Sequence, residues 1–245
     1  DPNYQGFIFG EGKTNEGPSA SHWLGTDNVS RDILARLIYG ARVSLIFAAS
    51  GVFFGIVIGG LVGSIAGYFR GFLETSLMFS VDVMLSFPAL IGFLCITQFL
   101  GRQDLFILCL VIAIFIWPPF SRVARATALS VSGKDFVTAA RAIGTSTRRI
   151  LFREIFPNVF PTLLAYGLVL LATLVILEST LSFLGLGVEI PTASWGGMIN
   201  QGRQDLLINI WPPIWPAATL LMTVFSFNNL ADWLQKQAAS RSAAI

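Results

Sequence analysis

Long apolar runs separated by short polar segments cover most of the chain. A helix needs about 20 mostly apolar residues to cross the hydrocarbon core of a bilayer. Runs of roughly that length recur along the sequence. They predict an all-α membrane protein, a polytopic helical bundle whose five transmembrane helices lie at about 43–68, 76–100, 105–121, 158–184 and 210–232.

Prolines and tryptophans mark the expected breaks and ends of these spans. Pro88 falls inside the second span and predicts a kink. The third span is expected to end at Trp117-Pro118-Pro119. Trp211 and Trp215 open the fifth span, where interfacial aromatic side chains gather. Residues 185–209 lack a sustained apolar run and predict a polar connection.

The first predicted span carries a glycine at every fourth position. Small residues at this spacing let two helix backbones approach closely. We therefore predict a helix-packing stripe, with contact to a substrate as the alternative. Its members are Gly51, Gly55, Gly59, Gly63 and Gly67.

The chain ahead of this span divides into a polar part and an amphipathic part. Residues 1–30 are polar and show no period. Ser30 is expected to cap a helix over 31–42, with its arginines off the apolar face. We predict an interfacial elbow helix, with an ordinary surface helix as the alternative. The predicted division is thus 1–42, an extracytoplasmic segment and elbow, and 43–245, the transmembrane domain. The apolar face would hold Ile33, Leu34, Leu37, Ile38 and Ala41, and the arginines are Arg31, Arg36 and Arg42.

Residues 122–157 form the longest polar interruption and are strongly basic. A short helix is predicted over 136–143, capped by Ser132 or Asp135 and ended at Gly144 in a left-handed conformation. A second helix, capped by Thr145 or Ser146, is expected to run to the region of Pro157. Two short helices joined at a glycine make a platform for a partner protein. The basic residues are Arg122, Arg125, Lys134, Arg141, Arg148, Arg149 and Arg153.

The distribution of positive charge predicts the orientation in the membrane. If 122–157 is cytoplasmic, ten Lys and Arg residues lie on that side and six on the other. Cytoplasmic loops carry an excess of Lys and Arg. Residues 1–30 and 185–209 are then expected outside.

Composition agrees with a membrane protein and argues against a nucleic-acid surface, a disulfide and a metal site. The 245 residues are 54% hydrophobic and 12% charged, against about 25% charged in soluble domains. The net charge of +2 indicates no nucleic-acid surface. Cys95 and Cys109 lie in apolar runs and are predicted to be small buried side chains, not a disulfide or metal pair. No metal site is expected.

The sequence contains no recognisable catalytic set. Gly12-Lys13-Thr14 lacks the upstream glycine of a phosphate-binding loop, since Phe7 stands at that position. We therefore expect the isolated chain neither to bind nor to hydrolyse ATP. Only Asp82 and Glu178 are ionisable residues within spans; whether they are structural or functional stays open. A proton- or ion-coupled transporter would more often place several charges near the membrane midplane, so their scarcity argues against that class.

Three segments together resemble one family. Thr138-Ala139-Ala140, Gly144 and Ile155-Phe156-Pro157 resemble the "EAA" loop of ABC importer permeases. Thr138 stands where that family usually has Glu, which removes any salt bridge that the Glu would make. HWLGTDNVSRDILARLIYGARVSL at 22–45 and LSFLGLGVEIPTASWG at 181–196 resemble the "C" permease subunit of dipeptide and oligopeptide importers.

This resemblance implies a type I importer permease in the bacterial cytoplasmic membrane, without enzymatic activity of its own. It implies a heterodimer with a second permease, two ATP-binding subunits and an extracytoplasmic peptide-binding protein, with ATP and Mg on the partner subunits and no cofactor on this chain. Since the family normally has one more transmembrane helix before residue 1, we expect a truncated start. The ATPase-docking residues would be Phe136, Val137, Thr138, Ala139, Ala140, Arg141 and Gly144.

Two alternatives differ in cargo or in class. The same family also imports nickel chelates, glutathione and oligosaccharides, and nothing in the spans separates these cargos. A stand-alone secondary transporter is the distant alternative. Copurification of ATPase subunits and stimulation by ATP would distinguish it from an ABC importer.

Overall fold

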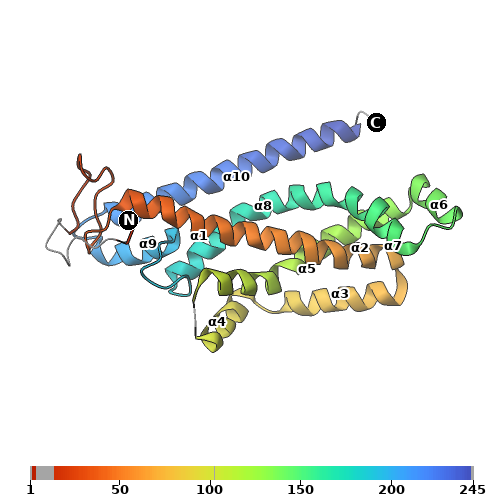
Figure 1. Cartoon of the computed structure of the whole chain (residues 1–245), viewed down its shortest axis with the longest axis horizontal. Coiled ribbons are helices and arrows are strands. Elements are labelled where there is room, and N and C mark those ends of the chain that lie inside the picture. The colour runs from red at the N-terminus through yellow and green to blue at the C-terminus, as the bar shows by residue number, and fades with distance from the viewer. Residues whose placement is uncertain (1, 4–13, 102, 244–245) are drawn as a thin grey trace. The chain divides into compact units, whose positions relative to one another are not determined.

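The computed structural model describes residues 2–3, 14–101 and 103–243, with the backbone alone for 235–243. Within these residues the chain is helical, and its only β-structure is the isolated bridge between Thr26 and Asp32 (Figure 1). The predicted all-α class is confirmed. Gly12 and Lys13 of the GKT segment lie outside the described residues.

The described residues form two compact units, each treated by itself. The first unit draws on residues within 1–49, 94–109 and 172–228, and the second on residues within 50–93, 110–171 and 229–245. Several long helices contribute to both.

The first helical run begins earlier than the predicted span. Helix α1 (Ile33–Phe54) continues through the π-helical segment η2 (Gly55–Gly59) into α2 (Gly60–Phe69). The predicted elbow over 31–42 and the first span therefore share one helical run, and no helix ends at residue 42. Asp32 caps α1 in place of Ser30, because its Oδ1 accepts from the Ala35 N–H at 2.8 Å.

Pro88 interrupts the second predicted span more strongly than a kink. Helix α3 (Gly71–Ser86) and helix α4 (Ala89–Leu100) are bent by 79° at the break. Phe87 is extended, with φ −82° and ψ 128°, as steric contact with a following proline favours. Cys95 on α4 is exposed, so the prediction that it is buried was wrong.

Pro118 and Pro119 do not end the third span. Helix α5 (Leu105–Ser132) passes through both prolines, as neighbouring helices allow in membrane proteins. Arg122 and Arg125 therefore lie on a helix, and the non-helical part of the predicted loop begins only at Gly133.

The basic segment contains two short helices, as predicted, but Pro157 does not end the second. Helix α6 (Asp135–Ala142) is followed by α7 (Thr147–Ile150), the π-helical segment η3 (Leu151–Ile155) and α8 (Phe156–Phe183) (Figure 1). These last three elements follow one another directly. The second platform helix is thus the start of the fourth predicted span.

The segment 185–209 holds a helix that the apolar pattern does not predict. Helix α9 (Trp195–Gly202) leads into the 3-10 turn η4 (Arg203–Asp205). Helix α10 (Trp211–Ala243) then starts near the predicted residue 210, with Asn209 Oδ1 accepting from the Trp211 N–H at 3.1 Å.

The predicted number of five spans is not confirmed. Among the described residues, three helical runs are long and apolar enough to cross a membrane: Ile33–Phe69, Leu105–Ser132 and Thr147–Phe183. The bent pair of α3 and α4 makes a fourth if it is one span. Helix α10 is long enough, but Thr219, Thr223, Ser226, Asn228 and Asn229 dilute its apolar sequence.

Candidate functional site

Helix α6 exposes the side chains of one face. Phe136 is 40% exposed, Thr138 and Ala139 are exposed, and Ala140 is half-buried. Val137 is fully buried against its own chain. Ile143, just beyond the helix, is 81% exposed. Phe136, Ala139 and Ile143 recur at helical spacing and form an exposed apolar stripe.

A glycine ends α6 as predicted. Gly144 has φ +77°. Its N–H donates to the Arg141 carbonyl at 3.0 Å, and the Thr145 N–H donates to the Ala140 carbonyl at 3.0 Å. These two bonds form a Schellman motif. The predicted side-chain cap is absent: Lys134 is the N-cap residue, and the Ser132 hydroxyl donates to Ala128 O at 2.6 Å.

Two of the seven basic side chains are paired with acidic groups of α3. Arg122 Nη2 lies 2.7 Å from Asp82 Oδ1, and Arg125 Nη2 lies 2.5 Å from Glu74 Oε1. This gives Asp82 a structural partner within the second unit. The exposed positive charge of the platform is carried by Lys134, Arg141, Arg148, Arg149 and Arg153.

The glycine stripe faces α5 within the second unit. A Cβ on Gly67 would lie 2.7 Å from Arg125 O, and one on Gly59 or Gly63 would overlap the Trp117 or Ser121 carbonyl. Gly55 lies against the Phe120 ring, and Gly51 is buried. Since backbone carbonyls cannot swing aside as a long side chain does, the close approach to α5 at these positions requires glycine.

Glu178 is buried at the centre of a hydroxyl network in the first unit. The Ser44 hydroxyl donates to Glu178 Oε2 at 2.5 Å, and the Ser182 hydroxyl donates to Oε1 at 2.7 Å. The Ser194 hydroxyl donates to Ser182 Oγ at 3.0 Å and accepts from the Gly197 N–H at 3.1 Å as the cap of α9. The network ties α1, α8 and α9 together, a structural role for Glu178.

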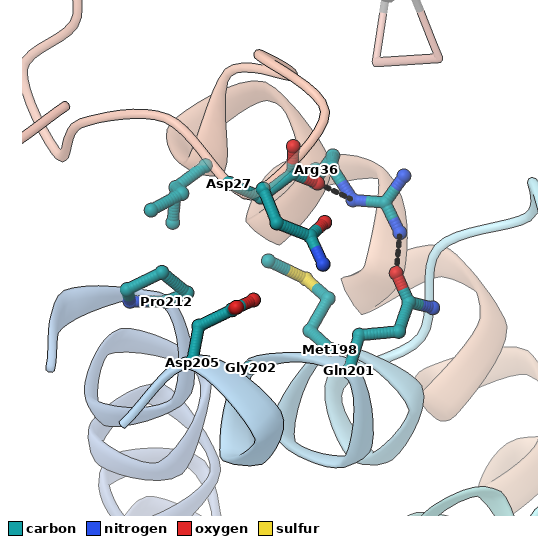
Figure 2. Close-up of a pocket in the computed structure, with 9 residues that line it drawn as sticks. Asp27, Arg36, Met198, Gln201, Gly202, Asp205 and Pro212 are labelled. Atoms are coloured by element: carbon teal, nitrogen blue, oxygen red, sulfur yellow. Dashed lines mark hydrogen bonds and ion pairs between the residues drawn. The ribbon is translucent and has the colours of Figure 1, made fainter. Parts of the chain in front are cut away.

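Two buried arginines share one aspartate near the start of α1. Asp27 Oδ2 lies 2.6 Å from Arg31 Nε and 3.9 Å from Arg36 Nε. Gln201 Oε1 on α9 accepts from Nη2 of both arginines, at 2.8 and 3.3 Å. Figure 2 shows the Arg36 guanidinium between Asp27 and Gln201. We call Asp27, Arg31, Arg36 and Gln201 the arginine cluster.

The sequence analysis placed the arginines off the apolar face of the first helix, but the arginine cluster is buried. Arg31 and Arg36 are 4% and 1% exposed, whereas Ile38 is 63% exposed. The arginines are buried because α9, which the sequence did not predict, supplies Gln201 and covers them. The i, i+4 spacing of Asp27 and Arg31 was the one sequence feature that could have indicated an ion pair.

The pocket beside this cluster is too small for a ligand. Asp27, Arg36, Met198, Gln201 and Asp205 are among its lining residues. Its cavity volume is about 10 Å³, about the smallest space that holds one water molecule. The cluster is therefore a structural joint between the start of α1 and α9.

Comparison with known proteins places the chain in a family. Residues 51–243 match the family described as "Binding-protein-dependent transport system inner membrane component". The chain is 37% identical over 221 residues to the "Glutathione transport system permease protein GsiD" of Escherichia coli O6:K15:H31 (strain 536 / UPEC) and to that of Shigella boydii serotype 4 (strain Sb227). Each alignment covers 90% of this chain and 73% of the relative.

Two solved structures share the fold. A chain of the inward-facing MetNI methionine ABC transporter matches with a TM-score of 0.68 and 20% identity, covering 84% of this chain and 97% of that one. A chain of an amino acid ABC transporter crystallised with histidines matches with a TM-score of 0.59 and 16% identity, covering 83% and 94%. At such identities the likeness concerns the fold alone.

The family match and the 37% identity agree with the EAA-type motif at 138–157 and with the apolar helical runs. Members act together with other permease and ATPase subunits. The chain belongs to the binding-protein-dependent transport system inner membrane components, and it is the inner-membrane permease of an ABC importer.

Proposed function

We propose that this permease imports short peptides, a class that includes the tripeptide glutathione. The observation that carries the proposal is the 37% identity, across 90% of the chain, to permeases named for glutathione transport. The segments 22–45 and 181–196, which resemble the "C" subunit of peptide importers, support the same class of cargo. The proposed assembly contains a second permease, two ATP-binding subunits and an extracytoplasmic binding protein.

Within this class, α-linked dipeptides and oligopeptides compete with glutathione, whose first peptide bond is γ-linked. The binding protein that copurifies with the complex should carry the cargo. Its ligand is released by denaturation and identified by mass spectrometry. A short peptide or glutathione supports the proposal, whereas a nickel chelate or an oligosaccharide contradicts it.

The proposed docking surface for the ATPase is α6 with its exposed apolar stripe, Phe136, Ala139 and Ile143. Thr138 adds an exposed hydroxyl, and the exposed side chains of Arg148 and Arg149 provide charge for acidic groups on the partner. Val137 and Ala140 lie toward the chain itself. An exposed apolar stripe within a basic surface fits a docking site better than a simple tether between two spans.

Gly144→Val is expected to weaken ATPase binding while leaving the protein inserted in the membrane. A β-branched residue disfavours φ +77°, at a cost of about 1–2 kcal/mol. A Cβ at this position would meet no atom within 4 Å, so the effect arises from the backbone alone. Membrane level and copurified ATPase are measured in parallel.

Gly144→Asn is the matched control, because asparagine tolerates the left-handed conformation. It should retain most ATPase binding. Equal ATPase recovery with glycine, asparagine and valine would show that the joint between α6 and α7 does not matter for docking.

The orientation is proposed from the positive charges: 122–157 in the cytoplasm, 1–30 and 185–209 outside. Single cysteines at Ala20, Ser146 and Thr192 occupy exposed positions in a background lacking Cys95 and Cys109. In intact cells, an impermeant thiol reagent should label positions 20 and 192 but not 146. Labelling at position 146 alone would show that the orientation is opposite to the one proposed.

A further inference from the structure

Arg141 on α6 lies over an aromatic ring of its own chain. Its guanidinium carbon is 4.8 Å from the centroid of the Tyr68 ring, within the range of about 6 Å for a cation–π contact. Tyr68 belongs to the last turn of α2. The contact joins two elements of the second unit that are far apart in sequence.

The attached face of α6 differs from its exposed face. Val137 and Arg141 are neighbours at i, i+4; Val137 is fully buried, and Arg141 stacks on Tyr68. Phe136, Ala139 and Ile143 form the exposed stripe. Helix α6 therefore holds to its own chain on one face and leaves the other available.

Tyr68 stands beside a sharp corner between α2 and α3. Arg70 and Gly71 both have positive φ, +53° and +62°, so the chain reverses within two residues. Glu74 in the first turn of α3 accepts from Arg125 Nε at 2.6 Å, and Gly67 lies close to Arg125 O. The α2–α3 corner is thus fixed to α5 by contacts on both sides of Tyr68.

We propose that the contact between Arg141 and Tyr68 is the link through which α6 moves the α2–α3 corner when the ATPase subunits close. This inference rests on the proposed function. It assigns Arg141 as a positioning residue inside the chain, whereas the family resemblance implied that Arg141 is an ATPase-docking residue. Docking and transmission then use different faces of one short helix.

The test uses the complete complex in proteoliposomes, with permease variants Arg141→Ala, Tyr68→Leu and the double variant. Two quantities are measured: ATPase copurified per permease, and ATP hydrolysed per molecule of transported cargo. Each single variant should retain ATPase binding and raise the ATP consumed per cargo about two- to fivefold, the factor expected for an exposed cation–π contact. The double variant should be no worse than either single variant.

Tyr68→Phe is the matched control, since it keeps the ring face on which the guanidinium lies. It should keep the wild-type ratio of ATP to cargo, whereas a role of the hydroxyl would make it resemble Tyr68→Leu and overturn the link. Loss of copurified ATPase in Arg141→Ala would also overturn it, because Arg141 would then contact the partner. Additive effects in the double variant would do the same. A wild-type complex without ATP-driven import would instead contradict the proposed function itself.

Discussion

Gly63→Leu is expected to force α2 away from α5 and to destabilise the second unit by at least about 1–3 kcal/mol, the usual cost of overpacking. A Cβ at residue 63 would overlap Ser121 O, lie 2.5 Å from Ala124 Cβ and lie 2.8 Å from Arg125 N. Two of these atoms belong to the backbone of α5 and cannot rotate away. The rest of the leucine side chain enters the same filled space.

Because this stripe packs within the chain, the damage should appear in the folding of the permease before it appears in assembly with partner subunits. Thermal unfolding of the purified permease in detergent measures it. Gly133→Leu is the matched control, because the nearest atom to a Cβ there is 3.7 Å away. Unfolding of Gly63→Leu at the wild-type temperature would mean that α2 and α5 are not in contact.

Asp27→Ala is expected to have the second large effect, in the first unit. It leaves the guanidinium groups of Arg31 and Arg36, which are 4% and 1% exposed as residues, without their shared carboxylate. Removing one partner of a buried ion pair typically costs about 3–5 kcal/mol. The substitution also removes the acceptor for the N–H groups of Val29 and Arg31, now at 3.1 and 2.8 Å.

Asp27→Asn separates the charge from the hydrogen bonds. The amide oxygen can still accept from the two backbone N–H groups, but it no longer neutralises the arginines. The expected order of unfolding temperatures is wild type, then Asp27→Asn, then Asp27→Ala. An alanine variant as stable as the wild type would show that Gln201 and solvent suffice for both arginines.

The apolar runs predicted the helical class and the approximate place of most spans, because length and hydropathy decide what can cross a bilayer. The ends of helices were predicted less well. Pro118, Pro119 and Pro157 read as terminators by rules drawn from soluble helices, yet each lies within a helical run here. Helix α9 was not predicted, because its eight residues include three glycines and no sustained apolar run.

The end of helix α6 was predicted from the sequence, but its buried face was not. Gly144 ends α6 as expected because few residues other than glycine favour positive φ. The buried face of α6 could not be predicted, since an eight-residue helix with three alanines offers little contrast between its faces. The burial of Arg36 could not be predicted either, because its partners Asp27, Pro191 and Gln201 come together only in the folded chain.

The most direct measurement is uptake by proteoliposomes that contain this permease, its second permease and both ATP-binding subunits, with the binding protein loaded with a labelled short peptide or glutathione. The complexes are oriented with the ATP-binding subunits facing the vesicle interior. ATP enclosed in these vesicles should drive accumulation of label inside them, and a non-hydrolysable analogue should not. Accumulation without ATP, or with this permease alone, would contradict an ATP-driven importer.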